Sequence, residues 1–191
     1  MRYQIYRGPK LTPLWVIIGV NILLYFVTLI GPQLRLLFGL MPALILDRPW
    51  TIVTSMFIHA GLWHVMANMF TLFFFGQNLI SLVGENRFLA VYFTGGILGG
   101  ILYVLLASPF SVAVGASGAV FAIGGALAML RPKTKVIIFP IPAPIPLWAA
   151  IGGGFLVLSF FPGIAWQAHL GGMIVGLIAG YIFRRRERFY H

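Results

Sequence analysis

"QAHLGGMIVGLIAGYIFRRRER", residues 167–188, is a long apolar run that ends in a cluster of arginines. A run of this kind suits a helix that crosses a lipid bilayer, with its basic end at the membrane surface. The rest of the chain has the same character, since 60% of its 191 residues are hydrophobic and only 8% are charged. Soluble domains carry about 25% charged residues. We therefore predict an all-α polytopic membrane protein with one domain over residues 1–191.

Six apolar runs can be placed along the chain, and prolines or glycines mark many of their ends. Pro13 and Pro146 stand at the start of runs, whereas Gly31 and Pro162 follow them, as is usual at helix boundaries. The expected architecture is a bundle of six transmembrane helices. The predicted spans are about residues 14–30, 62–83, 88–107, 116–130, 147–161 and 167–183.

The basic residues set the expected orientation, because cytoplasmic loops are enriched in Lys and Arg. With six spans and both termini in the cytoplasm, only Arg35 and Arg48 of the 13 basic residues lie outside. We therefore expect an integral, multi-pass protein of the cell membrane, surrounded by the lipid bilayer. The residues expected inside are Arg2, Arg7, Lys10, Arg87, Arg131, Lys133, Lys135, Arg184, Arg185, Arg186 and Arg188.

Composition also excludes several classes of function. The basic residues are separated by long apolar runs and form no continuous face, which argues against a nucleic-acid partner. The chain has no cysteine, so thiolate metal sites and cysteine nucleophiles are excluded. It also lacks the HExxH motif of zinc proteases. We expect no cofactor and no metal.

The fourth run is short for a transmembrane helix. Its 15 or so residues reach about 22 Å at 1.5 Å per residue, whereas the hydrocarbon core is about 30 Å thick. The helix would then begin below the membrane surface, after irregular backbone at residues 108–115. Such backbone is tolerated at depth only where it is buried in protein or lines a water-filled cavity. The sequence thus predicts a wet site beside Ser117.

Four polar residues fall at one depth in the predicted topology. His64, Ser117 and His169 lie near the starts of the second, fourth and sixth spans, and Asn68 follows His64 by one helical turn. A serine and a histidine on separate helices can form a nucleophile and its base, here Ser117 and His169. The Ser117 N–H has no intrahelical partner at a helix start. With His64 and Asn68 it can stabilise an oxyanion.

Simpler interpretations exist for each of these residues. Small residues such as Gly115, Gly118 and Gly172 commonly allow membrane helices to pack closely, and His64 with Asn68 can link helices by hydrogen bonds. No third, acidic member of a triad is evident, because the chain has only three acidic residues and none falls in a span. A Ser–His dyad is therefore the catalytic arrangement to expect. We assign no role to the remaining histidines, His59 and His191.

At these residues the sequence resembles the rhomboid family of intramembrane serine proteases. The GxSG motif of that family matches residues 115–118, and its HxxxN motif matches residues 64–68. Its histidine followed by small residues on the last helix matches residues 169–172. The three motifs occur in the expected order. The similarity extends from residue 48 to residue 176 and covers nearly all of the spans.

The resemblance implies a six-helix rhomboid-like core in which Ser117 is the nucleophile and His169 the general base. It also implies an aromatic residue, Phe121, packed against that histidine. Substrates would be single-pass membrane proteins cut near the extracytoplasmic end of their helix. Two positions depart from the family pattern: Thr51 stands where many relatives have Arg, and Ile80 where many have Glu. Both positions concern the support of the first loop.

Two other functions remain open from the sequence. The same scaffold can bind transmembrane clients without cutting them, although the retained serine and histidine argue against this. A small transporter or channel would carry intramembrane charges or inverted repeats, and neither is evident. No oligomeric state is predicted. We expect the short fifth run to be the side that moves to admit substrate.

Overall fold

The computed structural model describes residues 10–137 and 143–188, with side chains to Arg185. Within these residues the chain is predominantly helical, which confirms the predicted all-α membrane fold. Arg2, Arg7 and His191 lie outside the described residues, as do the side chains of Arg186 and Arg188. The apolar helices are α1 (Thr12–Ile30), α4 (Leu62–Val83), α5 (Glu85–Leu106), α6 (Ser117–Leu130), α7 (Leu147–Ser159) and α8 (Trp166–Arg188).

These helices coincide closely with the six predicted spans. Pro13 occupies the first turn of α1, and Pro146 is the N-cap of α7. Gly84 joins α4 to α5 with a φ of +86°, a conformation that favours glycine. Four helices, α1, α4, α5 and α8, are long and apolar enough to cross a membrane. Because α6 has 14 residues and α7 has 13, the count of six spans stays a prediction.

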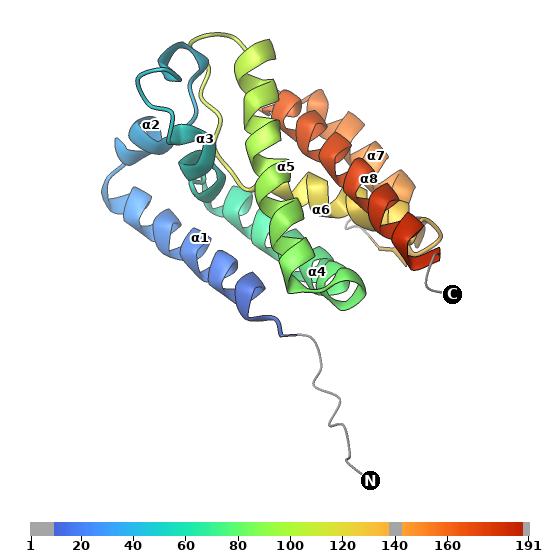
Figure 1. Cartoon of the computed structure of the whole chain (residues 1–191). Helices are drawn as coiled ribbons and strands as arrows, with labels where there is room; N and C mark the ends of the chain where they lie inside the picture. The colour runs from blue at the N-terminus through green and yellow to red at the C-terminus, as the bar shows by residue number, and fades with distance from the viewer. Residues whose placement is uncertain (1–9, 138–142, 189–191) are drawn as a thin grey trace.

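Short helical elements fill the loop between α1 and α4. They are α2 (Leu34–Phe38), the 3-10 helix η1 (Pro42–Leu44), α3 (Thr51–Thr54) and the 3-10 helix η2 (Ser55–Phe57). In Figure 1 they cover one end of the bundle, beside the start of α4. Near the opposite end, β1 (Lys135–Val136) pairs antiparallel with β2 (Ile145–Pro146).

The short helix α6 lies at the centre of the bundle and packs against α4, α5, α7 and α8 (Figure 1). Glycines bring α8 unusually close to it. A Cβ on Gly172 would collide with the carbonyl of Gly118, and one on Gly176 would collide with the carbonyl of Ala122. Only glycine at these positions of α8 permits backbone contact with α6.

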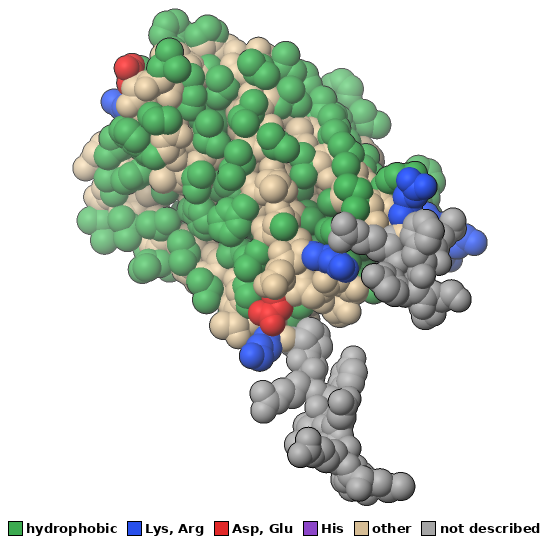
Figure 2. Space-filling model, viewed as in Figure 1, with side chains coloured by type: hydrophobic (Ala, Val, Ile, Leu, Met, Phe, Trp, Pro, Cys, Tyr) green, Lys and Arg blue, Asp and Glu red, His purple; other side chains and the backbone are tan. Residues whose placement is uncertain are grey.

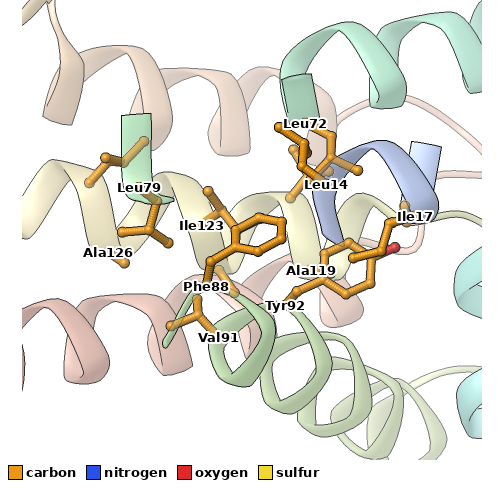
Figure 3. Close-up of a cluster of buried hydrophobic side chains, with 14 of the residues drawn as sticks. Leu14, Ile17, Leu72, Leu79, Phe88, Val91, Tyr92, Ala119, Ile123 and Ala126 are labelled. Carbon is orange, nitrogen blue, oxygen red and sulfur yellow. The ribbon is translucent and has the colours of Figure 1, made fainter. Parts of the chain in front are cut away.

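Large apolar side chains fill the space between α1, α4, α5 and α6. Leu14, Leu72, Phe88 and Ile123 are fully buried there and face one another in Figure 3. Apolar side chains are not confined to this core. They also cover the flank of the molecule in Figure 2, and the charged side chains lie at its ends. This distribution is that of a protein whose flank faces lipid. The chain is therefore an integral membrane protein.

Candidate active site

Ser117 begins α6, directly after a tightly held stretch of extended chain. Ala113 forms an isolated antiparallel bridge with Leu40, and the Gly115 N–H donates to the Ser55 carbonyl at 2.8 Å. Gly115 has a φ of +122°, which favours glycine. These contacts fix the backbone that presents Ser117 at the N-terminus of the helix, where its N–H has no intrahelical partner.

His169 meets Ser117 from the first turn of α8. Its Nε2 lies 2.7 Å from the Ser117 Oγ, within hydrogen-bond distance. Phe121, one turn along α6, stacks on the imidazole with ring centroids 4.6 Å apart and an interplanar angle of 27°. The histidine ring is thus held between the serine and an aromatic face. The two residues predicted to act as nucleophile and base lie in contact.

The other imidazole nitrogen of His169 is buried and has no hydrogen-bond partner among the described residues. A catalytic triad would have a carboxylate at this position to orient the ring. The arrangement is therefore a pair, in which burial and the stacked Phe121 restrict the imidazole.

His64 approaches the serine from α4. Its Nδ1 accepts a hydrogen bond from the Ala60 N–H at 3.4 Å, which assigns the ring proton to Nε2. A Cβ on Gly115 would lie 2.7 Å from this Nε2 and 3.8 Å from the Ser117 Oγ. The His64 N–H and the serine hydroxyl therefore flank the same point above Gly115.

Asn68 lies one turn further along α4 and is buried. Its Nδ2 donates to the His64 carbonyl at 2.9 Å, which leaves a second amide hydrogen for another acceptor. The structure places it on the wall of the same cavity as His64, Ser117 and His169. All four predicted polar residues therefore converge on one space.

That space is a cavity of about 990 Å³ between α4, α6, α7 and α8. The side chains of Thr71 and Phe75 line it from α4, and Ile151 and Leu158 line it from α7. Its walls are mostly apolar, and the four predicted polar residues are among its few polar groups. Pockets of this kind bind an apolar ligand and orient it by a small number of polar groups.

His59 is a member of the site that sequence reasoning left without a role. It is fully buried, its Nε2 accepts the Ala116 N–H at 3.5 Å, and its ring meets that of His64 edge-on at 5.0 Å. Burial, with a smaller contribution from His64, lowers the pKa of His59 from 6.5 to about 3. The spacing of five between two of only four histidines was the available signal.

Comparisons with known proteins agree with this geometry. The sequence profile of the Rhomboid domain matches residues 46–186. "Rhomboid protein 1, mitochondrial" from Saccharomyces cerevisiae is 31% identical over 158 residues, which cover 72% of this chain and 43% of that protein. "RHOMBOID-like protein 1" from Arabidopsis thaliana is 33% identical over 141 residues, which cover 73% of this chain and 36% of that protein.

The match to the rhomboid protein YdcA of Bacillus subtilis (strain 168) is 31% identical over 144 residues, or 74% of this chain and 71% of that protein. The chain thus spans less than half of the yeast and plant relatives and most of the bacterial one. The profile match includes α4 to α7 and α8 up to residue 186, and with them every residue of the Ser117 site. The chain belongs to the rhomboid family.

Proposed function

We infer that the protein is an intramembrane serine endopeptidase that cleaves transmembrane segments of single-pass membrane proteins through a Ser117–His169 dyad. The observation that carries this proposal is the 2.7 Å contact between Ser117 Oγ and His169 Nε2 at the edge of a large apolar cavity. Serine hydroxyls are weak nucleophiles unless a base within hydrogen-bond reach accepts their proton. The contact supplies that base.

In the first step, Ser117 Oγ attacks the scissile carbonyl while His169 Nε2 takes the hydroxyl proton. The carbonyl oxygen becomes an oxyanion as the C–O bond to the serine forms. The Ser117 N–H, the His64 Nε2–H and the free Asn68 N–H are the donors that stabilise it. His169 then gives its proton to the leaving amine, and the acyl-enzyme remains.

In the second step, a water molecule enters the cavity and loses a proton to His169 as it attacks the acyl carbon. The same three donors stabilise the second oxyanion. Collapse releases the new carboxyl terminus and returns the proton to Ser117 Oγ. No acidic third member is needed for these transfers, because Phe121 and burial hold the His169 ring in place.

The apolar walls of the cavity support this substrate class. An apolar segment fits between α4 and α7, and small, helix-poor residues expose their peptide bonds most easily. We expect entry from the α7 side. A Cβ added at Gly152, Gly153 or Gly154 meets nothing within 4 Å, so this helix is loosely packed along that stretch.

We place the protein in the cell membrane with both termini in the cytoplasm, on the strength of the basic residues. The mitochondrial location in the name of the yeast relative belongs to that protein. Reporter fusions at Gly163 and at the C-terminus test this orientation. The proposal expects activity of a periplasmic reporter only at Gly163, and activity only at the C-terminus contradicts it.

A fluorophosphonate probe tests the chemistry directly. It should label the purified protein at Ser117, and labelling should disappear in Ser117→Ala and in His169→Ala. Cleavage of a single-pass substrate, with the products mapped by mass, then separates a protease from a protein that only binds transmembrane clients. Binding of the substrate without cleavage, in a protein that the probe does not label, would support the second function.

A further inference from the structure

A chain of two hydrogen bonds leads from the first loop to His64. Arg35, in α2, donates from Nη1 to the Ala60 carbonyl at 3.0 Å. The Ala60 N–H in turn donates to His64 Nδ1 at 3.4 Å. One residue, Ala60, thus accepts a bond from the arginine and donates one to the histidine.

We propose that Arg35 is a positioning residue that holds the turn at Ala60 and so keeps the His64 proton on Nε2, facing Ser117. The proposal rests on the proposed function for its effect on catalysis. Its effect on the tautomer of His64 does not depend on that function.

The tautomer matters because a neutral imidazole has one donor and one acceptor nitrogen. While Ala60 donates to Nδ1, Nε2 must carry the proton, and Nε2 is the atom beside Gly115. If the Ala60 N–H turns away, the proton can move to Nδ1. Nε2 then presents a lone pair where the oxyanion forms, and the interaction changes from attraction to repulsion.

The charged side chain of Arg35 is suited to holding the Ala60 carbonyl. A guanidinium is always charged, and hydrogen bonds from charged donors are about twice as strong as neutral ones. The Arg35 Nε is buried without a hydrogen-bond partner in the described part of the chain, so the inner part of the guanidinium packs against the fold while its Nη1 reaches Ala60 at the surface. The backbone of Arg35 is fixed as well, because the Gly39 N–H donates to the Arg35 carbonyl at 2.9 Å.

The same loop also reaches the other side of the site. Leu40 follows α2 and exchanges two 2.9 Å hydrogen bonds with Ala113, which leads into the serine. Arg35 therefore ties the Ala60 turn to a loop that is itself bonded to the backbone before Ser117. The Ala60 turn and the backbone before Ser117 are therefore both held by the first loop, which restricts their movement relative to each other.

The positions that depart from the family pattern do not supply this tie. Thr51 donates to the Arg48 carbonyl at 2.7 Å within the loop, and the Ile80 side chain is apolar and buried. Arg48 donates from Nη1 to the Leu36 carbonyl at 3.3 Å. It makes the same kind of bond as Arg35, but to α2 and not to the Ala60 turn. Arg48 is therefore the matched control.

The test compares Arg35→Gln, Arg35→Lys and Arg48→Gln in the full chain, reconstituted in proteoliposomes. We expect Arg35→Gln to lower kcat and the rate of fluorophosphonate labelling by about tenfold, with KM within about twofold, since one oxyanion donor is worth 10²- to 10³-fold and only part is lost. Arg35→Lys should retain an intermediate rate. Arg48→Gln should stay near the wild-type rate.

The ¹⁵N chemical shifts of the His64 ring, assigned by their loss in His64→Gln, report the tautomer directly. Wild type and Arg48→Gln should show protonated Nε2, and Arg35→Gln should show a mixture of tautomers. An unchanged tautomer in Arg35→Gln overturns the proposal, whatever its activity. If the tautomer changes in Arg35→Gln but the probe does not label wild type, the positioning role is supported and the proposed function alone is refuted.

Discussion

The pH dependence of stability at His59 follows from burial. The folded side chain is fully buried and faces His64, and the pKa of His59 is lowered from 6.5 to about 3. Below pH 6.5 the unfolded chain therefore binds a proton that the folded chain does not. The contribution of neutral His59 to the free energy of unfolding is complete above pH 6.5 and is lost progressively as the pH falls toward 3.

The size of the loss follows from the two pKa values. At pH 5.0 the pH is about 1.5 units below the unfolded value, and each unit corresponds to about 1.4 kcal/mol. Wild type should therefore lose about 2 kcal/mol of unfolding free energy at this group between pH 7.5 and pH 5.0. His59→Gln keeps an acceptor for the Ala116 N–H but does not titrate, so its stability should fall less over this range.

The assay is reversible unfolding of wild type and His59→Gln in the same non-ionic micelles at the two pH values. The quantity compared is the pH-induced change in the free energy of unfolding, not the stability itself, since the substitution also alters packing. Introducing His64→Gln into both proteins removes the neighbouring titrating ring. Equal losses in the two proteins from pH 7.5 to pH 5.0 would refute burial as the cause.

Four further substitutions, with Gly153→Ala as a control, test the site and its packing. His64→Ala and Asn68→Ala should each slow substrate turnover by roughly tenfold to a thousandfold while the protein stays folded by circular dichroism; unchanged turnover removes that residue from the oxyanion site. Gly172→Ala should cost about 1–3 kcal/mol by overpacking α6 and should lower probe labelling, whereas Gly153→Ala, on open α7 surface, should do neither. Phe121→Leu should lower kcat several-fold by freeing the His169 ring, and an unchanged kcat contradicts a role of Phe121 in holding that ring.

The positions of the helices could be predicted because each depends on a long local signal. Apolar length, together with residues such as Pro13 and Pro146 at the starts, places every apolar helix near its observed bounds. The partners Ser117 and His169 could be predicted for a related reason. Each stands near the start of an apolar run, and runs that cross in the same direction bring their starts to the same depth.

The first loop could not be predicted in this way. Its elements α2, η1, α3 and η2 have three to five residues each, too few for an apolar period to show. Their positions depend on single bonds between residues far apart in sequence, such as Thr54 to the Phe38 carbonyl at 2.9 Å. The contacts of Arg35 are of the same kind, and no pattern of spacing predicts them.

Within the site, the approach of two helices could be predicted from the sequence, whereas the tautomer of a histidine could not. Ser117 and His169 are brought together by glycines that let α8 reach α6, and the spacing of Gly172 and Gly176 indicates that approach. In the proposed oxyanion site His64 requires more than proximity, because a histidine in the wrong tautomer opposes the charge that it should stabilise. That requirement is met by Ala60, a residue with no polar side chain, whose backbone takes its place only when the loop has folded.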